Sequence, residues 1–155
     1  MSNLTDQAER AAERLLKVEE EQLYVELGIR TRAVAKDPKK GGSFDPDVTY
    51  DGTEIGLLDD VRDFGKRLFR RWIVEVHKLA CGSDPDYEKE RKLLADKLGL
   101  SEVAVTAALT GILIANFGLA AAIASVIAAL IVKLFFRPTY EEFCQVWKEK
   151  LPQEG

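Results

Sequence analysis

The feature that most constrains the fold is a run of thirty residues without a charged side chain, from Val103 to Val132. Charged residues make up 31% of the 155-residue chain, so this run stands apart from the rest. Its apolar surface must be removed from water. As one helix it would be about 45 Å long, more than the roughly 30 Å thickness of a bilayer core. The run therefore belongs either to the centre of a helical domain or to a membrane.

A break inside this run is predicted at Asn116-Phe117-Gly118. Glycine readily takes the left-handed conformation that ends a helix. The sequence thus predicts two helices, at about 102–115 and 119–136, with Ser101 as the cap of the first. Arg137-Pro138 ends the second, because the residue before proline disfavours the α region.

Three amphipathic helices are predicted around this hairpin, at 5–36, 54–81 and 140–151. Each has apolar residues at three- and four-residue steps and charges on the other face, so each has one side to bury. Gly28 is a candidate point of division in the first. A shorter helix is expected at 86–98. Four large side chains are available to fill the spaces that the alanines of the hairpin leave: Phe64, Trp72, Phe143 and Trp147.

These elements predict a compact all-α bundle of six or seven helices around a central apolar hairpin at about 102–136. The length is typical of one domain, here residues 1–155. The clearest loop is 37–53, which contains two prolines, three glycines and four aspartates. A loop of this length is either mobile or functional.

The membrane alternatives are a permanent single span and a conditional insertion. The second half of the run, 117–136, has spanning length, and Lys133 lies near its end, where its side chain can reach the interface. The first half is too short to span. An apolar hairpin inside amphipathic helices resembles the layout of colicin-type pore-forming domains and of Bcl-2-like proteins, although no motif residue matches either family. That layout implies a form in which the outer helices open and 103–136 enters the bilayer.

The C-terminal part carries a second resemblance. The stretch from KLGLSEVAV (97–105) to FCQVWKEKL (143–151) resembles small uncharacterised helical bacterial proteins. It covers about a third of the chain and implies no activity.

His77 and Cys81 are the candidate metal ligands. A histidine and a cysteine four residues apart share a helix face and can clamp a metal ion. Further ligands would have to come from Cys144 and a distant carboxylate, and the chain has no CxxC or HExxH motif. A buried cysteine and a hydrogen-bonded histidine are therefore the favoured interpretation, and no metal or other cofactor is predicted.

A basic cluster is the candidate contact for a membrane or a partner. It could meet the phosphate groups of lipid or nucleic acid. Because Asp63 lies four residues before Arg67, an ion pair between them is expected, and a solvated helix face is the favoured interpretation. The cluster consists of Lys66, Arg67, Arg70 and Arg71.

The net charge and the two cysteines indicate which partners and which cellular compartment to expect. The net charge of −4 lacks the strong basic excess of nucleic-acid-binding proteins, so nucleic acid is not an expected partner. Two distant cysteines form no disulfide framework and fit a reducing cytoplasm, with a single bridge left open. The N-terminus has no apolar signal segment.

The chain contains no nucleophile elbow, P-loop or dinucleotide fingerprint. The sequence therefore predicts a non-enzymatic helical protein that binds a protein partner or a second copy of itself. The alternative is a conditional membrane-inserting protein that uses 103–136, and the third hypothesis is a small helical enzyme. The expected location is cytoplasmic, with membrane association as the alternative.

Overall fold

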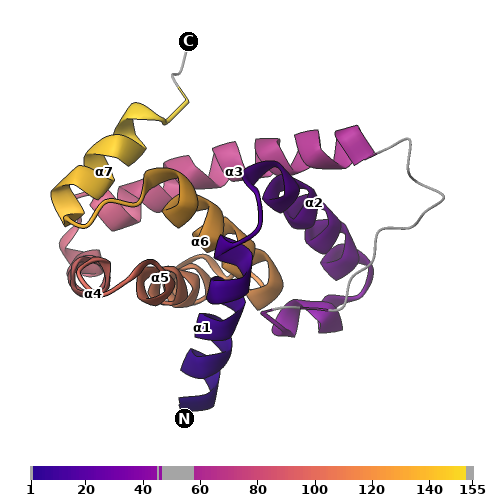
Figure 1. Cartoon of the computed structure of the whole chain (residues 1–155), viewed down its shortest axis with the longest axis horizontal. Helices are drawn as coiled ribbons and strands as arrows, with labels where there is room; N and C mark the ends of the chain where they lie inside the picture. The colour runs from indigo at the N-terminus through magenta and orange to yellow at the C-terminus, as the bar shows by residue number, and fades with distance from the viewer. Residues whose placement is uncertain (1, 45, 47–57, 153–155) are drawn as a thin grey trace.

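The computed structural model describes residues 2–44, 46 and 58–152. These residues form seven α-helices, two short 3₁₀ helices and no strand, so the predicted all-α fold is confirmed (Figure 1). The elements are α1 (Ser2–Leu16), α2 (Glu20–Lys36), η1 (Pro38–Gly42), α3 (Leu58–Cys81), η3 (Pro85–Tyr87), α4 (Glu88–Leu98), α5 (Glu102–Phe117), α6 (Ala121–Phe135) and α7 (Tyr140–Glu149).

The helices surround α6 (Figure 1). In this view α3 runs across the top of the molecule and α7 lies at its upper left. Helices α4 and α5 lie side by side at the lower left, and α1 descends to the N-terminus at the bottom. The long loop predicted at 37–53 begins with η1, whereas residues 45 and 47–57 lie outside the described part of the chain.

Helix α6 is the core of the domain. Every residue from Ala124 to Val132 has at most 2% of its surface exposed. A helix that is apolar on all sides needs partners on all sides, and here α1, α2, α5 and α7 provide them. The predicted apolar hairpin is therefore present, but only α6 lies at the centre of the domain, because α5 packs beside it with one face exposed.

The break between α5 and α6 lies where the sequence places it. The Ser101 side chain accepts a hydrogen bond from the Ala104 backbone N–H and caps the start of α5. Gly118 follows the end of α5 with a φ of 64°, a left-handed conformation that strains other residues. Helix α6 is shorter than the predicted 119–136, since it begins at Ala121 and ends at Phe135.

The predicted division of the first helix at Gly28 is wrong. The chain divides between Leu16 and Glu20, and Gly28 lies buried inside α2. A Cβ atom at Gly28 would lie 2.5 Å from the Val61 carbonyl oxygen of α3. This glycine therefore permits the close approach of α2 and α3 and does not end a helix.

Lys133 ties α6 to the end of α1. Its Nζ atom donates a hydrogen bond to the Leu16 carbonyl oxygen at 3.1 Å. The carbonyl groups in the last turn of a helix have no partner within the helix, and a cation there also interacts favourably with the helix dipole. Lys133, which the membrane alternative places at the bilayer interface, thus caps the C-terminal end of α1.

Candidate functional site

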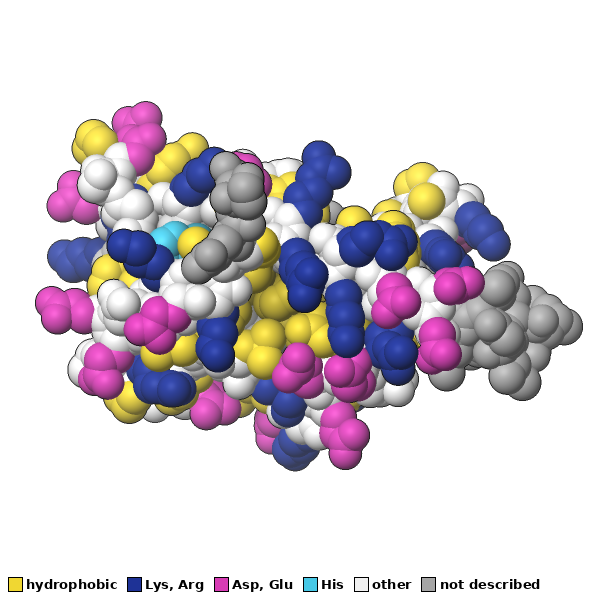
Figure 2. Space-filling model, turned by 90° about the horizontal axis from the view of Figure 1, so that it is seen from above, with side chains coloured by type: hydrophobic (Ala, Val, Ile, Leu, Met, Phe, Trp, Pro, Cys, Tyr) yellow, Lys and Arg dark blue, Asp and Glu magenta, His cyan; other side chains and the backbone are white. Residues whose placement is uncertain are grey.

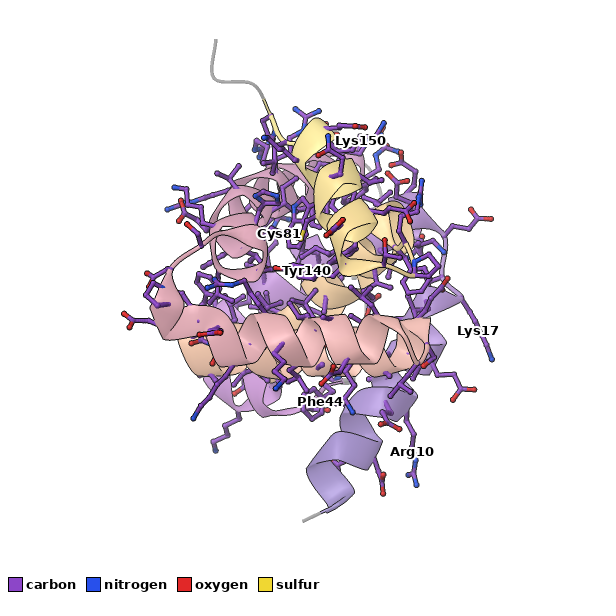
Figure 3. All side chains as sticks on the ribbon, turned by 90° about the vertical axis from the view of Figure 1, so that its left-hand side faces the viewer. Arg10, Lys17, Phe44, Cys81, Tyr140 and Lys150 are labelled. Atoms are coloured by element: carbon purple, nitrogen blue, oxygen red, sulfur yellow. A yellow bond between two sulfur atoms is a disulfide. The ribbon has the colours of Figure 1, made fainter. Side chains whose placement is uncertain are left out.

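A groove open to solvent lies over α5 and is the principal candidate site; we call it the α5 groove. It has a volume of about 730 Å³, within the range of ligand-binding clefts. Helix α5 forms its floor. One wall comes from α4, and the other side is bordered by α1 and by Gly42 and Phe44. Figure 3 faces the α4 side of the molecule and shows Phe44 below the helices at the front.

Small residues form much of the floor of the α5 groove, beside Ile112, Ile114 and Asn116. They recur at three- and four-residue steps and so occupy one face of the helix. A side-chain atom added at Gly111 would meet no atom within 4 Å, which leaves the floor open. Small residues allow another surface to approach the helix backbone closely. These floor residues are Ala104, Ala107, Ala108, Gly111 and Ala115.

The wall of the α5 groove carries the large apolar side chain of Leu93, which is 39% exposed. Outside the lining of the groove, Leu100, just before α5, is 71% exposed. These two are the exposed large hydrophobic side chains of the described residues. The charged side chains that line the groove are two glutamates and two lysines, namely Glu9, Lys89, Glu90 and Lys97.

One carboxylate oxygen of the groove has no partner. Oε2 of Glu90 is shielded from solvent, and no hydrogen-bond donor reaches it among the described residues. A shielded acceptor without a donor costs about 1–3 kcal/mol.

The basic cluster of α3 separates into two parts. The Lys66 ammonium group lies 3.3 Å from a Glu21 carboxylate oxygen and 5.5 Å from the centre of the Tyr24 ring. Arg67, Arg70 and Arg71 are exposed, and none of them forms an ion pair with a described residue. The expected pair between Asp63 and Arg67 does not form. We call these three residues the arginine trio.

The two cysteines form a disulfide. The Cα atoms of Cys81 and Cys144 are 5.7 Å apart, and the bond joins the end of α3 to α7. The Tyr140 hydroxyl donates a hydrogen bond to the Ala80 carbonyl oxygen beside it, and Figure 3 shows Cys81 and Tyr140 close together. Disulfides persist in oxidising compartments and are rare in a reducing cytoplasm. The single disulfide that the sequence leaves open as an alternative is therefore present. The cytoplasmic location stays a prediction.

His77 lies one helical turn before Cys81, as the sequence indicates, and packs against α7. Its ring meets the buried Trp147 ring edge-on at a centroid distance of 5.2 Å. A sulfur in a disulfide is not available as the thiolate that binds metal. Among the described residues no three His, Cys, Asp or Glu side chains are arranged to hold a metal ion. The alternative of a metal site at His77 and Cys81 therefore applies only to the reduced chain, where nothing tests it.

The position of His77 predicts how stability depends on pH. Burial lowers its pKa below the ordinary 6.5, a hydrogen bond with the Cys144 backbone opposes this shift, and Lys148 adds to it. The unfolded chain then binds a proton more readily than the folded chain. As the pH falls below 6.5, the contribution of His77 to the free energy of unfolding should decrease.

This prediction can be checked by urea unfolding at several pH values on both sides of 6.5. His77 is the only histidine, so His77→Gln removes all titration by imidazole from the chain. The difference in the free energy of unfolding between wild type and His77→Gln should change as the pH passes through 6.5. A difference that is the same at every pH would contradict the prediction.

Arg30 is a buried charge that the sequence does not reveal. Its side chain is fully buried between α2, α6 and Phe44. Its Nε atom donates to Glu26 at 2.9 Å, and Nη1 donates to the carbonyl oxygens of Phe44 at 2.9 Å and Ala122 at 3.0 Å. Nη1 also lies 3.2 Å from the Ser125 hydroxyl. Arg30 thus joins the start of α6 to α2 and to the chain after η1.

Within the described residues, no single helix is long and apolar enough to cross a membrane. Helices α6 and α7 together have the length and apolar composition of a membrane span, but the chain bends by 96° between them.

A search of protein-family models, of curated proteins and of solved structures finds no significant match to this chain.

Proposed function

We propose that this protein is a non-enzymatic helical protein that associates with a second copy of itself through the α5 groove. The observation that carries the proposal is a groove with small residues on its floor and the partly exposed Leu93 in its wall. Contiguous apolar surface beside a cleft is typical of interaction sites.

Shape favours a second copy as the occupant. In a twofold dimer the same surface patch of each subunit meets that of the other, so the patch must complement itself. Leu93 lies in the wall of the groove and is 39% exposed, while Gly111 and the alanines around it leave space on the floor. Leu93 of one copy can therefore enter the groove of the other, and the reverse contact forms by symmetry.

Charge favours the same occupant. The groove is lined by two lysines and two glutamates, whereas the whole chain carries a net charge of −4. A rim of one sign would repel a second copy, but a mixed rim lets lysines of one copy face glutamates of the other.

Substitution of Gly111 tests the proposal without disturbing the folded monomer. Space is open around this position, and glycine inside a helix is less favourable than other residues by about 1 kcal/mol. Gly111→Glu should fill the floor and place a charge in the interface, which raises the dissociation constant of the dimer at least about a hundredfold. The matched control is Gly111→Ala, which keeps the floor small and should keep the dimer.

Sedimentation equilibrium over a wide range of protein concentration checks this prediction. Wild type and Gly111→Ala should approach twice the chain mass of 17.3 kDa, and Gly111→Glu should stay near the chain mass. A wild-type protein that is monomeric at every concentration would refute self-association. Equal association of the two variants would show that the α5 groove is not the interface.

A further inference from the structure

We propose that the arginine trio, Arg67, Arg70 and Arg71, docks the protein on an anionic lipid surface. Arg70 and Arg71 follow Arg67 by three and four residues on α3, so both are neighbours of Arg67 on one exposed side of the helix. Guanidinium groups bind the phosphate groups of lipids through paired hydrogen bonds.

The trio is a local excess of positive charge on an acidic protein. Its basic neighbours are neutralised, since Arg62 lies 3.3 Å from Asp59 and Lys66 lies 3.3 Å from Glu21. On the C-terminal side of the trio, Glu75 lies 3.5 Å from Lys78. The three arginines have no such acidic partner in the described part of the chain. Their charge is therefore available to an external anion.

Apolar side chains flank the trio and favour a lipid surface over a soluble anion. Leu68 and Trp72 lie beside it on α3 and are half-buried. The Trp72 ring meets the half-buried Phe117 ring edge-on, at a centroid distance of 5.6 Å. Figure 2, which faces the α3 side, shows a hydrophobic patch bordered by Lys and Arg side chains and, along one edge, by Asp and Glu side chains. Aromatic rings at the headgroup level and cations on phosphates are the contacts of an interfacial surface.

This surface is separate from the α5 groove. In Figure 1, α3 lies at the top, whereas η1 and the first turns of α1, which border the groove, lie at the bottom. Lipid docking and self-association can therefore succeed or fail independently. The inference does not require that any helix enters the bilayer.

Vesicle flotation of the full chain tests the inference. The probes are vesicles of phosphatidylcholine alone and vesicles that also contain phosphatidylserine. The variant is the triple substitution Arg67→Gln, Arg70→Gln and Arg71→Gln. Its matched control changes the net charge equally at three exposed lysines elsewhere, by Lys36→Gln, Lys40→Gln and Lys92→Gln.

Wild type should bind the vesicles that contain phosphatidylserine, and added salt should weaken this binding. The arginine variant should lose about a hundredfold in partitioning, because each basic residue near an anionic surface contributes about 1 kcal/mol. The lysine control should bind nearly as well as wild type. Circular dichroism confirms that both variants are folded.

Three outcomes would overturn the inference. Wild type could fail to float with either vesicle, or it could bind both vesicles equally. The lysine control could also lose as much binding as the arginine variant, which would indicate attraction by overall charge and not by the trio. Binding of the trio to a soluble phosphopeptide without binding to vesicles would equally exclude the lipid surface.

Discussion

Removal of the Cys81–Cys144 disulfide is expected to lower the free energy of unfolding by about 4 kcal/mol. The bond joins positions 63 residues apart and therefore restricts a long loop of the unfolded chain. That loop includes α4, α5 and α6, so the constraint acts on the core of the domain. Urea unfolding of the oxidised protein and of the double variant Cys81→Ser, Cys144→Ser measures the loss.

A reducing agent provides the control. It should lower the stability of the oxidised wild type to about that of the double variant, and it should leave the double variant unchanged. Mass spectrometry of alkylated protein gives the number of free thiols before each experiment. Equal stability of the oxidised wild type and the double variant would contradict this prediction.

Replacement of the buried Arg30 is expected to have the second large effect. Arg30→Met should lower the free energy of unfolding by about 3 kcal/mol, because it removes one partner of a buried ion pair. Glu26 keeps 26% of its side chain exposed and can be hydrated in part, which limits the loss. The carbonyl oxygen of Phe44 and the hydroxyl of Ser125 lose a hydrogen-bond donor as well.

Arg32→Met is the matched control for this prediction. Arg32 is exposed on the same helix, and its guanidinium carbon lies 5.4 Å from the centre of the Phe64 ring. Its replacement should cost about 1 kcal/mol or less. The double variant Arg30→Met, Glu26→Met should recover part of the stability lost in Arg30→Met. Equal effects of Arg30→Met and Arg32→Met would contradict the role of the buried arginine.

The fold class and the apolar hairpin could be predicted because they depend on local signals. A charge-free run, a glycine able to take positive φ and a serine cap are all readable from neighbouring residues. Two long-range links of the domain, at Arg30 and at the disulfide, are of another kind. Arg30 reaches Ala122 across 92 positions, and Cys81 reaches Cys144 across 63. Helical periodicity indicates which face is buried, but it does not indicate which distant group that face meets.

For the candidate sites too, the sequence does not indicate which distant residues come into contact. The sequence predicts a basic cluster of four residues, but Lys66 is separated from the arginine trio by its ion pair with Glu21 of another helix. The α5 groove has a sequence signal, namely small residues from Ala104 to Ala115 at helical spacing. That signal predicts that another helix packs closely on α5. It does not show whether that helix belongs to the same chain or to a partner, because this depends on where α1 and α4 lie.

The most direct test of self-association through the α5 groove is an NMR measurement on a mixture of labelled and unlabelled protein. Isotope-filtered spectra detect only contacts between methyl groups of different copies. We predict contacts between the Leu93 methyl groups of one copy and the Ala108 methyl group of the other, and their loss in Gly111→Glu. A sample with twice the chain mass but no such contact would contradict the account, as would a sample that remains monomeric.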